Sequence, residues 1–358
     1  MGLWHNGTCM YPLNSIANVA AAVFKALRNG WCWDAPDSGG RPATSLPRGR
    51  PVAPLVVTVL LALIVLCGCG AGHPPAGTGA PAHLVVLGDP HLPGNNLAAK
   101  RAVLAQINSW WDVALVVAVG DLTEKYGTDR EYAAAATYFR NLRHPLAPIV
   151  GNHDYYFQTP YPLAARRYVR APFVFQQAKL AKFRQTFGLG QHYYKLEIGG
   201  YLLLFLSTDH NRFGTGIGEA QLAWLRNQLL RHRNQPTIIF AHPPLHGTQT
   251  RFRHYVNRPH AVIQPAAWMH TLLTTNPQVF LWVSGHTHTP PTEASYASFI
   301  NIYADRIINI HNYSMKGDTI WTNSLYLYPD RVQVRTFNHR ENRWQAEFDR
   351  TIPVPPPR

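Results

Sequence analysis

The sequence predicts a mixed α/β sandwich, because two spacings of apolar residues alternate along the chain. Apolar runs at residues 83–88, 115–120, 149–151, 237–241 and 279–285 are each bounded by turn-forming residues. Runs of this length are typical of strands that are buried on both faces of a sheet. Segments with helical spacing separate them, which indicates helices packed on β-sheets in one domain, from about residue 82 to 350.

Capping and turn residues mark the limits of the expected elements. Thr128 and Glu131 form a capping box that opens one helix. Gly199 and Gly200 provide the turn of a hairpin between two strands. We expect helices over residues 96–111, 128–143, 219–232 and 265–275, and further strands over residues 193–197, 201–207, 299–311, 319–328 and 331–338.

The N-terminal part of the chain differs from this pattern. Residues 1–50 have no sustained hydrophobic period, so we expect a poorly ordered extension, or a translation start further downstream, near Leu46. Residues 51–69 combine a basic flank, a short apolar core and small residues, as secretory signal peptides do. Residues 70–81 are rich in Gly and Pro and are expected to form a linker.

The end of the apolar core indicates how the protein is attached and where it acts. Leu66-Cys67-Gly68-Cys69 resembles a bacterial lipoprotein box, in which Cys69 would carry the lipid. Simple secretion and an uncleaved membrane anchor are the alternatives, since the core is shorter than a usual membrane span. We therefore expect an exported protein, periplasmic or otherwise extracytoplasmic, that is anchored to a membrane.

Cysteine usage and charge narrow the chemistry. The chain has four cysteines, at positions 9, 32, 67 and 69, so none lies in the predicted domain. This excludes a disulfide framework, a thiolate metal site and a cysteine nucleophile there. The formal net charge of +14 favours an anionic partner such as a phosphate ester, or reflects solubility alone. No specific nucleic-acid or protein partner is indicated.

Side chains of metal-ligand type close each apolar run. Ligands in open α/β sheets bind at the carboxyl ends of the strands, where these side chains would meet. Oxygen and imidazole donors without sulfur suit Mn, Fe or Zn, and seven donors exceed the needs of one ion. Two ions that share a carboxylate are typical of in-line phosphoryl displacement. The candidate ligands are Asp89, His91, Asp121, Asn152, His242, His286 and His288.

The order of these residues resembles a known family. Asp89-x-His91, Gly120-Asp121, Gly151-Asn152-His153-Asp154, His242 and Gly285-His286-x-His288 resemble, in order, the five motifs of the calcineurin-like metallophosphoesterases. The resemblance covers residues 83–288 and implies a four-layer α-β-β-α sandwich with two mixed β-sheets and a dinuclear metal site at the strand C-terminal ends. It implies that Asp121 bridges the ions, with Asp89, His91 and His288 on one and Asn152, His242 and His286 on the other.

The resemblance also implies a mechanism. A metal-bridging hydroxide attacks phosphorus in line, and His153 acts as the general acid for the leaving oxygen. Asp154 either orients His153 or caps the turn. Purple acid phosphatases have a tyrosine where this chain has Glu124, and Gly120-Asp121-Leu122-Thr123 looks more like the bacterial cyclic-nucleotide phosphodiesterase branch. We therefore expect a phosphodiesterase, with a phosphomonoesterase or a non-catalytic metal-bearing scaffold as alternatives.

Substrate contacts are harder to predict. His210, His246 and Arg251 are candidates because they lie close in sequence to the strand ends that carry ligands. Two basic stretches, residues 155–190 and 246–264, are expected either to cap the site and bind an anionic substrate or to form ordinary solvated loops.

Overall fold

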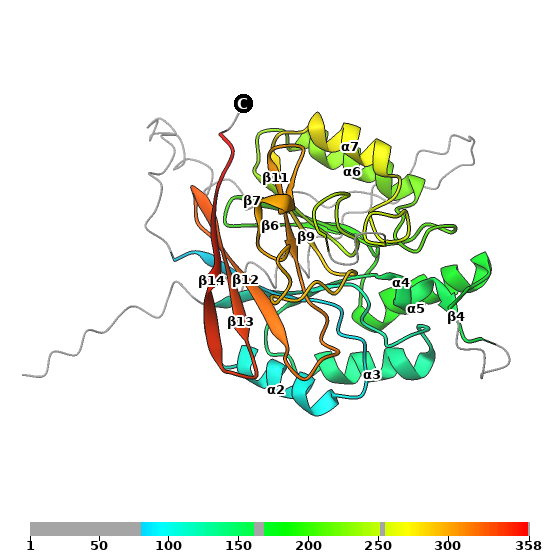
Figure 1. Cartoon of the computed structure of the whole chain (residues 1–358). Helices are drawn as coiled ribbons and strands as arrows, with labels where there is room; N and C mark the ends of the chain where they lie inside the picture. Colours follow the sequence, from blue (N-terminus) through cyan, green and yellow to red (C-terminus); the bar gives the residue numbers. More distant parts are fainter. Residues whose placement is uncertain (1–79, 161–167, 251–254, 357–358) are drawn as a thin grey trace, which may run out of the picture. The chain divides into compact units, whose positions relative to one another are not determined.

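The computed structural model describes residues 80–160, 168–250 and 255–356, and residues 80–358 cluster as one compact unit (Figure 1). The predicted N-terminal extension, the signal segment with Cys69 and nearly all of the linker lie outside the described residues. Within the described ranges, no helix is both long enough and apolar enough to cross a membrane.

The first sheet has six strands in the order β14-β13-β12-β1-β2-β3. Strands β1, β2 and β3 are parallel to one another, whereas β12, β13 and β14 are joined in antiparallel fashion to the other edge of β1. The bounds are β1 Ala82–Leu87, β2 Val113–Val119, β3 Leu146–Ile149, β12 Trp321–Leu327, β13 Arg331–Asn338 and β14 Arg343–Pro353.

The second sheet also has six strands, in the order β10-β11-β9-β8-β7-β6. Its four central strands are parallel, and β6 and β10 pair in antiparallel fashion at the two edges. The bounds are β6 Tyr194–Ile198, β7 Tyr201–Leu206, β8 Thr237–Ala241, β9 Val279–Ser284, β10 Ile302–Tyr303 and β11 Ile307–His311. A short 3-10 helix, η1, covers Phe299–Asn301, just before β10.

Alternate residues of the buried strands face different layers. In β1, Leu84 and Val86 join the core between the two sheets, whereas Val85 and Leu87 join a second core against helices. In β8, Phe240 joins the core between the sheets, and its neighbours face the helices of the other side. This period of two explains why the strands are apolar on both faces.

Two groups of helices cover the outer faces of the sheets. Helices α2 (Leu97–Ile107), α3 (Asp129–Phe139) and α5 (Phe173–Phe187) contribute to the core of the first sheet. Helices α6 (Glu219–Arg231) and α7 (Ala266–Thr274) contribute to that of the second. Figure 1 shows α6 and α7 on one side of the sheets and α2 and α3 on the other. The predicted four-layer α-β-β-α sandwich with two mixed sheets is confirmed.

Most predicted elements are present, with ends shifted by a few residues. The capping box of α3 forms, because Thr128 N donates to Glu131 Oε2 at 2.8 Å and Glu131 N donates to Thr128 Oγ1 at 3.3 Å. The hairpin between β6 and β7 turns at Gly199 and Gly200, whose φ angles of 60° and 87° suit glycine.

Some elements were not predicted from the sequence. Residues 155–190 contain helix α5 and the short strands β4 (Phe157–Gln158) and β5 (Val169–Arg170). The four-residue helix α4 (Asn152–Tyr155) precedes them and begins at a predicted ligand. Strand β14 was also missed and extends to Pro353, beyond the expected limit at residue 350.

Candidate metal centre

Each of the five sequence motifs lies at the carboxyl end of a parallel strand. Strands β1, β2 and β3 of the first sheet end just before Asp89, Asp121 and Asn152. Strands β8 and β9 of the second sheet end just before His242 and His286. Both sheets therefore contribute side chains to one cluster, as expected for strands whose carboxyl ends meet.

The first group of candidate ligands comprises Asp89, His91, Asp121 and His288. Their donor atoms all lie within 4.8 Å of one another. His288 Nε2 is 2.8 Å from Asp89 Oδ2 and 3.3 Å from His91 Nε2. His91 Nε2 is in turn 3.7 Å from Asp121 Oδ2. These imidazoles and carboxylates therefore converge on a single point.

The second group comprises Asp121, His242 and His286, again with donor atoms within 4.8 Å of one another. His242 Nε2 lies 3.3 Å from Asp121 Oδ1 and 3.1 Å from His286 Nδ1. Asn152 Oδ1 is 3.0 Å from the same His242 nitrogen. Asp121 belongs to both groups, with one carboxylate oxygen toward each. Oxygen and imidazole donors in two groups that share a buried carboxylate fit two borderline cations.

The backbone at these ligands is unusual. Positive φ angles cost a non-glycine residue of the order of 1 kcal/mol and concentrate at functional sites. The strain places successive side chains of a short loop on the same side. The non-glycine ligands with positive φ are Asp89 (35°), His91 (45°), Asp121 (51°), His286 (65°) and His288 (47°).

Two motif glycines are required because the chain passes very close to a ligand. A Cβ at Gly151 would lie 2.3 Å from Asp121 N, and a Cβ at Gly285 would lie 2.0 Å from Asp89 Oδ1. These distances are far below ordinary van der Waals contact, so any side chain at either position would displace a carboxylate ligand or its backbone.

Burial and neighbouring charges together set the pKa values of the side chains in the cluster. Burial raises the pKa of Asp121, but the neighbouring His242 and His153 outweigh this effect and hold that pKa well below its usual range. Burial lowers the pKa of His242, but the carboxylates of Asp121 and Asp89 raise it to about 9. Burial and the charge of His242 lower the pKa of His286 to about 4. The Asp121 carboxylate therefore stays charged and needs positive charge beside it, from an imidazolium or a cation.

Backbone carbonyls fix the orientation of three imidazole rings. His91 Nδ1 donates to Glu124 O at 3.0 Å, His242 Nδ1 to Val119 O at 2.8 Å and His153 Nδ1 to Lys125 O at 3.0 Å. Because a carbonyl only accepts, Nδ1 carries a proton in each ring and Nε2 faces the cluster. Imidazoles held in this way are typical metal ligands and proton carriers. His242, whose pKa is about 9, also carries a proton on Nε2 at neutral pH, and a cation bound at that nitrogen would displace it.

His153 and Asp154 follow Asn152 but have different surroundings. His153 Nε2 lies 3.9 Å from Asp121 Oδ2, and its side chain is 12% exposed. Burial lowers the pKa of His153, while the charge of Asp121 partly offsets this. Asp154 is fully buried and accepts from Thr123 N and Gly151 N, both at 2.8 Å. Its carboxylate thus caps the turn, which is one of the two roles expected of Asp154.

The three residues predicted to contact substrate have different surroundings. Arg251 lies outside the described residues. His210 Nδ1 accepts from Arg212 N at 3.0 Å and so organises its own turn. His246 is exposed, and no hydrogen bond or ion pair joins either histidine to a candidate ligand in the described part of the chain. The roles of His210, His246 and Arg251 in substrate binding stay a prediction.

Two lysines of the basic stretch 155–190 make contacts within the fold. Lys179 donates to Tyr126 O at 2.5 Å and also to the carbonyl of Phe157, and Lys182 pairs with Asp129 at 2.8 Å. These lysines attach α5 to the elements beside it. The expectation that residues 155–190 and 246–264 cap the site stays a prediction.

Two lysines near the cluster were missed. Lys100 is buried in α2 and donates to His91 O at 2.8 Å, which supports the loop that carries this ligand. Its helical spacing from Leu97 and Leu104 places it on the buried face, so the sequence held a signal for it. Lys316 is exposed. Burial of the two rings is the main cause that lowers the pKa values of His91 and His153, and the positive charge of Lys316 lowers both further, so Lys316 lies near both rings.

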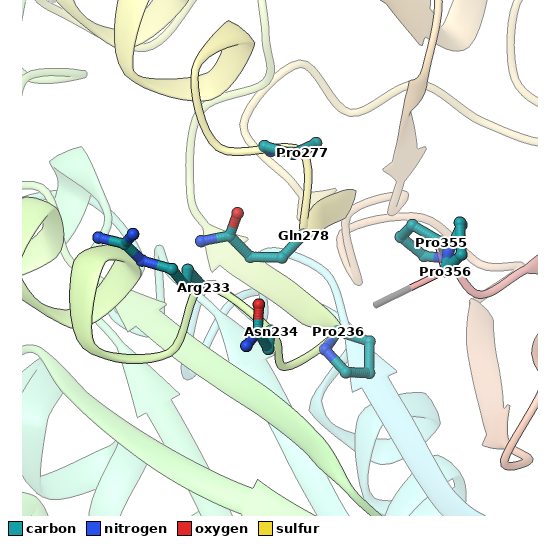
Figure 2. Close-up of a pocket in the computed structure, with 7 residues that line it drawn as sticks. All are labelled: Arg233, Asn234, Pro236, Pro277, Gln278, Pro355 and Pro356. Carbon is teal, nitrogen blue, oxygen red and sulfur yellow. The ribbon is translucent and has the colours of Figure 1, made fainter. Parts of the chain in front are cut away.

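A surface pocket of about 280 Å³ lies away from this cluster (Figure 2). Pro236 and Gln278 line it, and they precede β8 and β9, whereas His242 and His286 follow these strands. Pro355 and Pro356 of the C-terminal tail complete its wall. The pocket is therefore at the opposite ends of the strands from the candidate ligands.

Comparison with known proteins identifies the family. The family model for calcineurin-like phosphoesterases matches residues 82–290, which is more than half of the 358-residue chain. The chain belongs to the calcineurin-like phosphoesterase family. It is thus a hydrolase of phosphoric esters, and membership of this family implies a dinuclear metal centre. No curated protein matches the sequence.

Solved structures agree at the level of the fold. A purple acid phosphatase from seeds of yellow lupin (Lupinus luteus) superposes with a TM-score of 0.53 at 13% identity, over 78% of this chain and 55% of the lupin chain. This chain thus spans about half the length of that phosphatase. GAP50, the anchor in the inner membrane complex of Plasmodium, superposes with a TM-score of 0.47 at 12% identity, over 78% of this chain and 91% of GAP50. At 13% identity, the likeness to the lupin phosphatase concerns the fold alone.

Proposed function

We propose that this phosphoesterase is a phosphodiesterase with two metal ions at the cluster and His153 as general acid. The observation that carries the proposal is the division of the donors into two groups that share Asp121, with His153 Nε2 3.9 Å from that carboxylate. Two ions at shared ligands clamp the attacking and leaving oxygens of a phosphoryl displacement.

The proposal gives each ligand a place. Bound at these positions, the ions supply a water of lowered pKa and the positive charge that attack on phosphorus requires. The metals are drawn from Mn, Fe and Zn, given the donor types. One ion would be held by Asp89, His91 and His288, the other by Asn152, His242 and His286, and Asp121 would be common to both.

His153 is suited to deliver a proton. Its Nδ1 is occupied by Lys125 O at 3.0 Å, so Nε2 is the atom that exchanges a proton with the leaving oxygen. Burial, which lowers its pKa, makes the protonated ring a stronger acid. Asp121 supports the protonated form, so the same carboxylate serves both the ions and the acid.

A diester fits the charge around the cluster better than a doubly charged monoester. Lys125 is already paired with Glu124 at 3.0 Å, which leaves Lys316 as the exposed lysine whose charge acts on His91 and His153. Glu124 also replaces the tyrosine of purple acid phosphatases, and Gly120-Asp121-Leu122-Thr123 favours the bacterial cyclic-nucleotide phosphodiesterase branch. A phosphomonoesterase is the second candidate.

The site of action is part of the same proposal. Residues 51–69, with Cys69 at their end, support export and attachment to a membrane by a lipid or an uncleaved segment. Labelling of the native protein with a fatty-acid probe, with Cys69→Ala as control, tests the lipid. Export of the protein without any labelling would favour the simple signal.

Hydrolysis of bis(p-nitrophenyl) phosphate and of p-nitrophenyl phosphate by Mn²⁺-loaded protein tests the activity. We expect two ions per chain by elemental analysis and a higher kcat/KM for the diester. Faster turnover of the monoester would establish the phosphomonoesterase instead. Two bound ions without turnover of either ester would indicate a metal-bearing scaffold.

A further inference from the structure

Three aromatic side chains gather beside His153. The rings of Tyr168 and Phe157 have their centroids 5.0 Å and 5.3 Å from that of the imidazole. Tyr168 is also 4.8 Å from Phe157 and 6.0 Å from Tyr126. We call Tyr126, Phe157 and Tyr168 the aromatic shelf. It adjoins the candidate metal centre because His153 lies 5.0 Å from the ring of His91 on its other side.

Packing does not account for the aromatic shelf. Tyr168 is 53% exposed, and Tyr126 and Phe157 are only partly buried, so part of each side chain remains open to solvent. Large aromatic groups held at the surface next to a catalytic cluster are common where a ligand is bound. Burial and the charge of Tyr126 raise the pKa of Tyr168, and the carboxylate of Asp121 adds to this, as expected for a ring near the cluster.

Contacts from α5 and the pairing of β4 with β5 fix the position of the aromatic shelf. Lys179 of α5 donates to the carbonyls of both Tyr126 and Phe157, which fixes two members relative to each other. Burial lowers the pKa of Lys179 to about 8, so this position costs the fold free energy. The pairing of Phe157 with Arg170 and of Gln158 with Val169 sets the position of the chain next to Tyr168. Rigid support of this kind is typical of a binding surface.

We propose that the aromatic shelf binds a planar ring of the leaving alcohol, so that Tyr168 determines specificity for esters with an aromatic leaving group. The proposal rests on the proposed function, in which His153 donates to the leaving oxygen. A substituent on that oxygen lies on the His153 side, where the Tyr168 ring is 5.0 Å from the imidazole. The ring is either bonded directly to the oxygen, as in an aryl ester, or separated by a sugar, as in a nucleoside ester.

Stacking of a base on an aromatic side chain contributes about 1–3 kcal/mol, or roughly 5- to 150-fold in an equilibrium or rate constant. The competing explanation is that the shelf only shields His153 from water. Shielding acts on proton transfer, so its effect would grow with the basicity of the leaving oxygen whether or not a ring is present, whereas stacking affects only esters with a ring.

The test compares Tyr168→Ala with wild-type full-length protein loaded with Mn²⁺. The substrates are methyl p-nitrophenyl phosphate, a thymidine methyl phosphate diester, and methyl trifluoroethyl phosphate, which has no ring. We expect the kcat/KM loss for a ring-bearing ester to exceed the loss for the trifluoroethyl ester by at least about 5-fold. The ring-bearing ester with the larger loss distinguishes the aryl from the nucleoside source. Equal losses for all three esters would overturn the proposal, and so would losses that rise with the basicity of the leaving oxygen, from p-nitrophenyl through trifluoroethyl to thymidine.

Variants and a binding measurement complete the design. Tyr168→Phe keeps the ring and should restore the preference for the aromatic ester. Trp111→Ala is the control for the loss of an exposed aromatic elsewhere. Trp111 is 79% exposed and lies just before β2, at the far end of that strand from Asp121. Binding of phenylphosphonate and of methylphosphonate gives a second readout that needs no turnover. If wild type hydrolyses no diester, the proposed function fails, and the phosphonate affinity ratio of Tyr168→Ala still decides the shelf. An unchanged ratio refutes it.

Discussion

The substitution Gly285→Ala adds one methyl group and is expected to weaken the binding of one of the two metal ions without unfolding the domain. In Gly285→Ala the new Cβ would lie 2.0 Å from Asp89 Oδ1 and 3.4 Å from a methyl group of Val119. The carboxylate must therefore retreat by about 1 Å or more, whereas metal–ligand distances tolerate about 0.2 Å. Crowding of this kind costs the fold about 1–3 kcal/mol. The retreat also breaks the bond from His286 N to Asp89 Oδ1, now 3.0 Å.

The expected loss in affinity for one of the two ions is at least about 10–100-fold, the effect of disturbing residues that merely orient a ligand. Titration calorimetry with Mn²⁺ measures the affinity, and thermal unfolding measures the stability. Gly188→Ala is the matched control, because nothing lies within 4 Å of its Cβ but its φ is +65°. It should lose about 1 kcal/mol of stability and keep both ions. Binding of two ions with wild-type affinity by Gly285→Ala would refute this reasoning.

Four further substitutions test other parts of the molecule. Asp121→Asn should abolish diester hydrolysis and reduce the bound ions below two by elemental analysis; full occupancy with normal turnover would contradict the shared ligand. His153→Ala should slow esters of poor leaving groups more than those of good ones, and equal losses would count against the general acid. Burial lowers the pKa of His311 to about 4, so its stabilising contribution is complete above pH 6.5 and is lost as the pH falls toward 4. His311→Gln should flatten the unfolding free energy over that range by up to about 3 kcal/mol, and an unchanged pH profile would exclude His311 as the cause. The guanidinium nitrogens of Arg350 are buried without a hydrogen-bond partner among the described residues, so Arg350→Met should leave the melting temperature unchanged or higher. A marked drop would show that the contact of the guanidinium with the Tyr296 ring, 5.9 Å away, stabilises the fold.

The sequence predicted the fold best where burial is complete. The central strands are apolar on both faces, so their pattern is unambiguous, and their order with the helices defines the layers. Strand β14 was missed because it is an edge strand in which Glu347 and Asp349 interrupt the pattern. Helix α5 was missed because Phe173, Val174 and Phe175 are exposed, which obscures its buried face. Both elements depend on tertiary contacts that local spacing does not record.

The candidate ligands could be predicted because each follows a strand directly, and strand direction alone brings them together. The groups around them could not be predicted in this way. The carbonyl of Lys125 and the aromatic shelf depend on how loops from separate strands cross. His210 shows the converse, since it follows β7 closely but uses its ring within its own turn.

The candidate ligands come from both sheets, and this has a consequence for the lifetime of the fold. His91 and His288 are 197 positions apart in the chain, and Asn152 and His242 are 90 positions apart. Ions held at these residues would therefore act as reversible cross-links between the two halves of the sandwich. Ligand binding to the folded state alone adds about 4 kcal/mol when the free ion is a thousandfold above its dissociation constant. A chelator would then shorten the survival of the protein as well as stop turnover, and metal supply would govern both.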